Sequence, residues 1–90
     1  MRYQVEIPSH VRREIEALPG HMRQRIKRSI AELADNPRPA HAVEMRATLQ
    51  GYYKIRLEHY RIVYRVADDI LVVTVVKAGK KSTDFYNDLP

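Results

Sequence analysis

The feature that most constrains the fold is an alternation of polar and apolar residues through positions 51–66, GYYKIRLEHYRIVYRV. Side chains alternate between the two faces of a strand, so the pattern predicts strands at about 52–57 and 60–66, joined at Glu58-His59. A register symmetric about Glu58-His59 keeps apolar residues opposite apolar residues, with Ile55 facing Ile62. This register fits a loop of two residues or of four, because Glu-His is a poor sequence for the tightest turn.

The polar face of the same two strands is mostly cationic, and it comprises Tyr52, Lys54, Arg56, Arg61, Val63 and Arg65. The expected register puts Arg56 directly opposite Arg61, and like charges so placed destabilise a hairpin by a few tenths of a kcal/mol to about one. A phosphate between them would convert repulsion into charge-assisted hydrogen bonds, so the pattern indicates an anion site. The alternative is that solvent screening makes the clustering harmless.

The first third of the chain predicts a strand and two helices. Residues 2–7 alternate, and Pro8 ends this strand. Ser9 is expected to cap a first helix, which Pro19-Gly20 ends. The apolar positions of this helix are Val11, Ile15 and Leu18.

A second helix is expected over about residues 21–35, and a proline-rich segment follows it. Its apolar stripe comprises Met22, Ile26, Ile30 and Leu33, and its first half carries Arg23, Arg25, Lys27 and Arg28. These cations form either a solvated face or a surface that contacts a partner or RNA.

The second half of the chain completes the predicted sheet. A short extended piece is expected around Val43 to Ala47, and a third strand at about 70–77 follows a turn at Asp68-Asp69. The remaining tail is polar and turn-like. The predicted fold is α+β: an N-terminal strand, an antiparallel helical hairpin and a three-stranded antiparallel meander, forming one domain over residues 1–90. We expect the two helices of the helical hairpin to pack on an antiparallel sheet.

Composition narrows the class of protein. The chain has 90 residues, a formal net charge of +5 and a pI near 9.7. A charge this basic favours a polyanionic partner such as nucleic acid, an acidic protein or a membrane surface. The absence of cysteine excludes disulfides and thiolate metal sites. The N-terminus has no apolar signal region, and no apolar run is long enough to span a bilayer, so we expect a cytoplasmic protein without a membrane partner.

The tail adds cations and aromatic rings, namely Lys77, Lys80, Lys81, Phe85 and Tyr86. Cations with an exposed ring are typical of single-stranded RNA sites, because the charges bind phosphate and the ring stacks on a base. The alternative for Tyr86 is that it packs into the core. The residues expected to contact RNA outside the reaction centre are Tyr52, Arg65, Lys77 and Lys80.

Metal-dependent chemistry has no support in the pattern of ligand residues. The spacing of His10, His21 and His41 matches no metal-ligand pattern, and the aspartates at 68, 69 and 84 are expected to form turns. His59 beside Glu58 could act in acid–base catalysis, but a hairpin tip is more typical of a solvated turn. We therefore expect no metal and no other cofactor.

The order of these segments resembles the RelE/ParE superfamily of bacterial toxins, and specifically its RelE side. The resemblance is carried by the YKIRL strand at 53–57, the YRIVY strand at 60–64, the apolar strand at 70–76, and Gly79-Lys80-Lys81 with Tyr86 beyond. It implies a toxin of a type II toxin–antitoxin system. Such a toxin is an endoribonuclease that cuts mRNA in the A site of the 70S ribosome, and a cognate antitoxin silences it. Contact with operator DNA would be indirect, through the antitoxin.

By this resemblance, Lys54 is a catalytic lysine, Arg56 a second cation, Arg61 the phosphate-binding arginine and Lys81 a group near the leaving oxygen, while Tyr86 orients or stacks on the substrate. Two residues depart from the family pattern: Arg56 replaces a lysine and Lys81 an arginine. The tail alignment is also one residue shorter than in some relatives.

The reaction requires a base for the 2′-OH, stabilisation of the phosphorane and a proton for the 5′ oxygen. Lys54 is the expected base, because neighbouring cations favour the neutral form of a lysine. Arg56 and Arg61 would bind the scissile phosphate, and Lys81 would donate the proton. The alternatives are a ParE-like inhibitor of DNA gyrase and a non-catalytic RNA- or protein-binding module.

Overall fold

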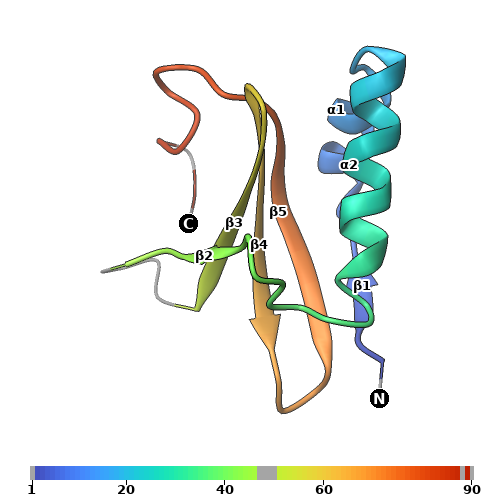
Figure 1. Cartoon of the computed structure of the whole chain (residues 1–90), viewed down its shortest axis with the longest axis vertical. Helices are drawn as coiled ribbons and strands as arrows, with labels where there is room; N and C mark the ends of the chain where they lie inside the picture. The colour runs from blue at the N-terminus through green and yellow to red at the C-terminus, as the bar shows by residue number, and fades with distance from the viewer. Residues whose placement is uncertain (1, 47–50, 88, 90) are drawn as a thin grey trace.

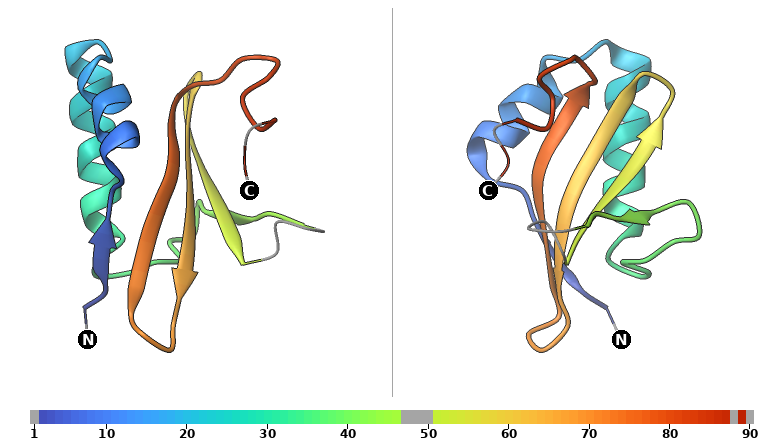
Figure 2. Two further views of the ribbon diagram at one scale, coloured as in Figure 1. Left: turned by 180° about the vertical axis from the view of Figure 1, so that it is seen from behind. Right: turned by 90° about the vertical axis from the view of Figure 1, so that its left-hand side faces the viewer.

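The computed structural model describes residues 2–46, 51–87 and 89. These residues form a five-stranded sheet with two helices on one face and the C-terminal tail on the other (Figures 1 and 2). The helices are α1 (Ser9–Glu16) and α2 (Gly20–Glu32), and the strands are β1 (Gln4–Glu6), β2 (Val43–Glu44), β3 (Tyr52–Leu57), β4 (Tyr60–Ala67) and β5 (Val72–Lys80). The predicted α+β order, with a helical hairpin followed by a three-stranded meander, is confirmed.

The sheet has the strand order β1-β5-β4-β3-β2. Neighbouring strands are antiparallel except β1 and β5, which are parallel, so the prediction of an antiparallel sheet was wrong for this pair. β1 has only three residues, and so short a strand has too few side chains for the sequence pattern to specify its partner or direction. The short extended piece predicted near Val43 is β2 on the edge of β3, while Ala47 lies outside the described residues.

The hairpin of β3 and β4 has the predicted register, with Arg56 opposite Arg61 and Ile55 opposite Ile62. Leu57 pairs with Tyr60, so the loop has two residues and the four-residue alternative is excluded. Glu58 adopts a φ of 56°, which is the left-handed conformation that so tight a turn requires.

The third strand of the meander begins and ends later than predicted. Ile70 lies in the turn before β5 and is 66% exposed, and Leu71 has a left-handed φ of 55°, so neither joins the strand. At the other end, residues 78–80 continue β5 rather than begin the tail. The turn at Asp68 is therefore longer than the sequence indicated.

Both helices begin after a proline. Pro8 is the N-cap of α1 and Ser9 is its first helical residue, with no side-chain capping bond, so the prediction that Ser9 caps the helix was wrong. The carbonyl of Pro8 instead accepts the first backbone hydrogen bond, from Arg12 N at 2.9 Å. Pro19 has the same place before α2, which ends at Glu32 rather than at about residue 35. No helix among the described residues is long and apolar enough to cross a membrane.

The core lies between the helix pair and the sheet. The apolar stripes of α1 and α2 pack on the apolar face of β3, β4 and β5, and the buried cluster comprises Val11, Ile15, Ile26, Ile30, Leu33, Ile55, Ile62, Tyr64, Val73, Val75 and Ala78. Tyr64 donates its hydroxyl to Pro37 O at 2.8 Å, and burial raises the pKa of Tyr64 to about 12. The phenol is therefore a permanent donor within this core.

A β-bulge interrupts the pairing of β4 with β5. Val63 lies opposite Lys77 and Tyr64 lies opposite Val75, so Val76 is an extra residue in β5. A bulge reverses which face each later residue occupies. Ala78 consequently reaches the core, and Lys77 shares the outer face with Val63.

Candidate functional site

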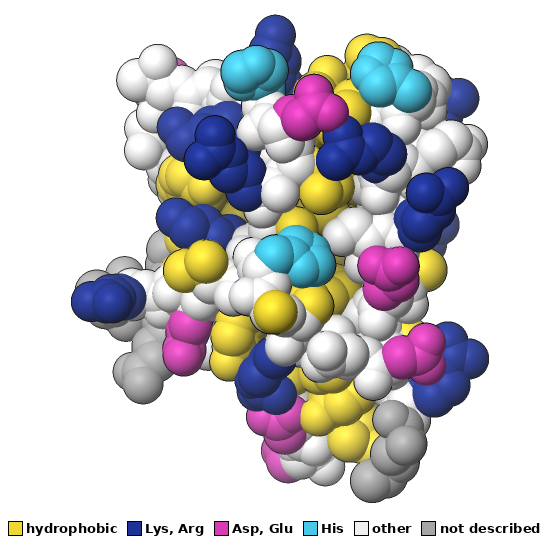
Figure 3. Space-filling model, in the orientation of Figure 1, with side chains coloured by type: hydrophobic (Ala, Val, Ile, Leu, Met, Phe, Trp, Pro, Cys, Tyr) yellow, Lys and Arg dark blue, Asp and Glu magenta, His cyan; other side chains and the backbone are white. Residues whose placement is uncertain are grey.

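The cationic side chains predicted to bind an anion lie on the face of the sheet opposite the helices. Lys54 and Arg56 in β3 and Arg61 in β4 alternate with the core residues Ile55 and Ile62, so their side chains lie on the opposite face. The tail folds over this face of the sheet (Figure 1). The space-filling view shows Lys and Arg side chains gathered in the part of the molecule where the hairpin lies beside the tail (Figure 3). The sheet and the tail together therefore form the candidate site.

Tyr86 is the point where the tail meets this cationic face. Lys54 Nζ lies 5.5 Å from the centroid of the Tyr86 ring, and Lys81 Nζ lies 5.9 Å from it. Ammonium groups within about 6 Å of a ring centroid make cation–π contacts. The structure thus brings together Lys54, Lys81 and Tyr86, which come from a strand and from two positions in the tail.

The two aromatic residues of the tail have different environments. Phe85 is only 4% exposed, so the packing alternative considered for the tail applies to Phe85, whereas Tyr86 is half-buried between the lysines. Their rings meet edge to face, with centroids 5.0 Å apart and planes at 86°. Phe85 therefore supports the ring that faces the site.

Arg61 is held near the hairpin tip by the backbone. Its Nη1 donates to Glu58 O and to Tyr60 O, each at 2.9 Å. The tail begins at the same place, since Lys81 N donates to His59 O at 2.7 Å. These bonds bring the Arg61 guanidinium and Lys81 to the same end of the face.

A hollow of about 530 Å³ opens between the hairpin tip and the tail, and it is lined by His59, Arg61, Lys81, Ser82 and Thr83. Each of these side chains can donate a hydrogen bond, and two of them, Arg61 and Lys81, are cationic side chains. Such a lining can bind a phosphate group. Arg56 lies opposite Arg61 in the sheet and adds a further charge beside the hollow.

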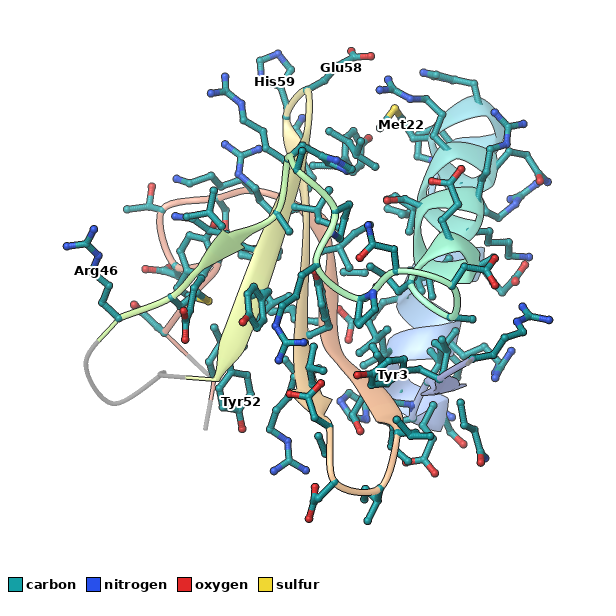
Figure 4. The ribbon with its side chains drawn as sticks, turned by 60° about the horizontal axis from the view of Figure 1, so that its bottom comes forward. Tyr3, Met22, Arg46, Tyr52, Glu58 and His59 are labelled. Carbon is teal, nitrogen blue, oxygen red and sulfur yellow. The ribbon has the colours of Figure 1, made fainter. Side chains whose placement is uncertain are left out.

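Two residues predicted to bind RNA lie at the other end of this face. Tyr52 and Arg65 form an opposed pair, four residues along β4 from Arg61, or about 13 Å at the usual rise of a strand. Figure 4 shows Tyr52 at the end of β3 remote from Glu58 and His59. The structure therefore does not bring this pair to the hollow.

The two other residues predicted to bind RNA lie on opposite faces of β5. Lys80 pairs with Tyr60, whose ring packs against the core, so Lys80 lies on the side of the helices, away from Lys54. Lys77 lies on the outer face, but its Nζ donates to the carbonyl oxygen of Phe85. Simple alternation along β5 does not predict either position, because the bulge reverses it.

Some of the cationic side chains of α2 bind other residues of this chain. Arg25 forms an ion pair with Glu58 at the hairpin tip, and Arg23 donates to Glu16 O and Leu18 O at 3.3 Å. The sequence did not predict these contacts, nor the part of Ser82 and Thr83 in the hollow, because no local pattern marks them. Within residues 2–46, 51–87 and 89, no three His, Asp or Glu side chains gather as a metal site would require.

Comparisons with known proteins agree over almost the whole chain. The model of the ParE toxin family of type II toxin–antitoxin systems matches residues 5–85. A RelE-like toxin protein of Escherichia coli is 33% identical over 89 residues, covering 97% of this chain and 93% of the relative. The mRNA interferase toxin RelE of Escherichia coli is 30% identical over 90 residues, covering 98% of this chain and 94% of the relative.

Solved structures match in the same way. A double arginine-to-alanine mutant of E. coli toxin RelE in the free state superposes with a TM-score of 0.78 at 29% identity, covering 98% of this chain and 94% of that one. The same toxin mutant in complex with an antitoxin RelBc peptide gives a TM-score of 0.75 at 29% identity, covering 97% and 92%. The sequence, the fold and the family model thus agree, and the chain belongs to the RelE-like toxins of the RelE/ParE family of type II toxin–antitoxin systems.

Proposed function

We propose that this toxin is an endoribonuclease that cleaves mRNA in the A site of the ribosome by attack of a 2′-OH on the adjacent phosphate. The observation that carries the proposal is the convergence of Lys54 and Lys81 on the Tyr86 ring, beside the hollow that Arg61 lines. The relatives named mRNA interferase toxin RelE support it. The proposal treats residues 1–90 as one toxin domain.

The proposed reaction divides the chemistry among these side chains. Lys54 accepts the proton of the 2′-OH, and Lys81 donates a proton to the departing 5′ oxygen. Arg56 and Arg61 bind the scissile phosphate and stabilise the charge that develops on it, since a guanidinium remains protonated throughout. The Tyr86 ring stacks on a base, which places the sugar–phosphate link over the lysines.

The proposal includes the partners of such an enzyme. Its substrate is mRNA held by the 70S ribosome, and it works in the cytoplasm, where that substrate is found. A cognate antitoxin silences it, as supported by the structure of E. coli RelE with an antitoxin RelBc peptide. Any contact with operator DNA is made through the antitoxin.

Replacement of Lys54 tests the proposal directly. Lys54→Met should lower cleavage of a translated mRNA by at least about a hundredfold, because general base catalysis contributes on that order. Primer extension on the message after in vitro translation measures the cuts. Lys27→Met is the matched control, because Lys27 lies on α2 and pairs with Glu16. Binding of the antitoxin should survive both changes, and wild-type cleavage by Lys54→Met would refute the role of Lys54.

Inhibition of DNA gyrase is the second candidate function, because the matching family model is that of the ParE toxin and a ParE-like gyrase inhibitor is the alternative expected from the sequence. A supercoiling assay with purified gyrase separates the two functions. Loss of supercoiling together with intact mRNA ends would replace the nuclease proposal. A protein that is harmless on expression, and whose RNA affinity merely falls with salt, would instead be a binding module.

A further inference from the structure

We propose that Lys77 is a positioning residue that holds the tail so that Tyr86 lies between Lys54 and Lys81. This inference rests on the proposed function for its catalytic consequence, but the anchoring itself can be measured without RNA. The sequence predicted that Lys77 binds RNA. In the structure, its ammonium group is directed at the tail of its own chain.

The contacts of Lys77 with Phe85 are of two kinds. Its Nζ donates to the carbonyl oxygen of Phe85 and also lies 4.6 Å from the centroid of the Phe85 ring. A charge-assisted hydrogen bond and a cation–π contact from one ammonium group fix both the backbone and the ring of Phe85. Phe85 is thereby held in its buried position.

The position of Phe85 is transmitted to Tyr86 through the rings and the backbone. The two rings pack edge to face with centroids 5.0 Å apart. The start of the tail is bound to the hairpin tip, since Lys81 N donates to His59 O at 2.7 Å. Farther along, the backbone bonds of Phe85 and Asn87 are turns within the tail: Phe85 N donates to Ser82 O and Asn87 N donates to Asp84 O, each at 3.1 Å. Turns of this kind do not bind this part of the tail to the sheet, whereas the contact from Lys77 joins it to β5.

The bulge in β5 is the independent observation that supports this role. If the register of Tyr64 with Val75 continued without a bulge, Val76 would pair with Val63, and Lys77 would pair with Ile62 and point toward the helices. The bulge turns Lys77 to the outer face, opposite Val63. Bulges commonly redirect a side chain next to a functional site, and here the redirected side chain reaches the tail that carries Tyr86.

The first test measures how tightly the tail is held. Chymotrypsin cleaves after aromatic residues, and nicking at Phe85 or Tyr86 requires the tail to open. Lys77→Met should raise the rate of nicking about tenfold, the order expected from the loss of one charge-assisted hydrogen bond and one cation–π contact. Lys77→Arg, which can make both contacts, should restore slow nicking. Lys80→Met is the matched control, because it removes the same charge from the same strand but on the helix side.

The second test asks whether the anchor acts through Tyr86. Single-turnover cleavage of ribosome-bound mRNA should slow about tenfold in Lys77→Met and recover in Lys77→Arg. In a Tyr86→Ala background, Lys77→Met should cause no further loss, because the ring that it positions is absent. A contact with RNA would instead weaken binding equally in both backgrounds and reduce its salt dependence.

The outcomes of these tests are distinct. Equal nicking of Lys77→Met and Lys80→Met overturns the anchoring role, and an undiminished effect of Lys77→Met in the Tyr86→Ala background overturns the positioning of Tyr86. A wild-type protein that cleaves no translated mRNA overturns the proposed function and the catalytic consequence of Lys77 with it. Fast nicking of Lys77→Met in that case would still establish the anchor.

Discussion

Arg56 and Arg61, to which the proposed function assigns phosphate binding, show at the scale of single residues how such a site would oppose stability. They are a directly opposed pair in an antiparallel hairpin, where like charges destabilise. Arg61 offsets part of this cost through its two bonds to backbone carbonyls at the hairpin tip, whereas Arg56 is exposed. In the proposed function, a phosphate bound between these side chains would replace their repulsion by charge-assisted hydrogen bonds.

Removal of one charge should therefore stabilise the fold and impair the enzyme. We expect Arg56→Gln to raise the free energy of unfolding by a few tenths of a kcal/mol up to about one, because the cross-strand repulsion disappears. Urea denaturation measures this change, and single-turnover cleavage should become slower in the same variant.

Arg65→Gln is the control for stability. Arg65 lies on the same face but opposite Tyr52 and Thr74, so the same loss of charge relieves no opposed pair. Equal stabilisation by the two substitutions would show that net charge, rather than the facing arginines, determines the effect.

At the scale of elements, Tyr64 connects β4 to the segment that follows α2. Its ring stacks on Tyr53 with centroids 5.7 Å apart, and its hydroxyl donates to Pro37 O within the core. Both Tyr64 and Pro37 are buried, so water does not readily replace this bond. The hydrogen bond thus holds the segment between α2 and the edge strand β2 against β4.

Tyr64→Phe should lower the free energy of unfolding by about 1–3 kcal/mol, because the carbonyl of Pro37 would remain buried without its donor. Chemical denaturation monitored by circular dichroism measures the loss. Tyr52→Phe removes a hydroxyl from the half-buried end of β3 and should cost less. Equal losses in the two variants would contradict a special role for the buried bond.

The strands also show which parts of the fold could be predicted from the sequence. The alternation of residues 52–66 was sufficient to predict β3, β4 and their register, because apolar residues had to face the core on both strands. The start of β5 was predicted wrongly because Ile70 is apolar yet exposed in a turn. Hydrophobicity predicts burial only on average, and the left-handed Leu71 has no signature in the sequence.

At the scale of the whole molecule, a polar cluster joins segments that are distant in the chain. Arg38 donates to both carboxylate oxygens of Asp68, at 3.0 and 2.7 Å, and its Nε donates to the Tyr53 hydroxyl. Tyr3 donates its own hydroxyl to Asp68 at 2.6 Å. The cluster thus connects the N-terminal strand, the segment after α2 and the turn between β4 and β5.

This cluster should make stability depend on pH in acid. The hydrogen bonds from Arg38 and Tyr3 lower the pKa of Asp68 from 3.8 to about 2. A carboxylate whose pKa is lower in the folded state contributes stability above its unfolded pKa and loses it as the pH falls. Wild-type stability should therefore decline as the pH falls from about 4 through 2, and Asp68→Asn should flatten that decline.

Thermal denaturation from pH 5 to pH 2 measures the effect. Asp69→Asn removes a carboxylate from the same turn and should keep the wild-type profile. Salt should weaken the dependence, because the cluster is exposed and its charges are screened. If Asp68→Asn loses stability between pH 5 and pH 2 as the wild type does, another group must cause the dependence of stability on pH.

The sequence by itself determined the elements, the hairpin register and the clustering of Lys54, Arg56 and Arg61, because these depend on alternation and on neighbours in one hairpin. Only the tertiary structure decided that β1 pairs in parallel with β5 and that Tyr86 reaches Lys54. It also decided that Lys77 faces the tail while Lys80 faces the helices. The physical reason is that pairing between distant segments depends on long-range contacts. In β5, the extra residue Val76 reverses the face that Lys77 and Lys80 occupy, and no local pattern in the sequence marks this bulge.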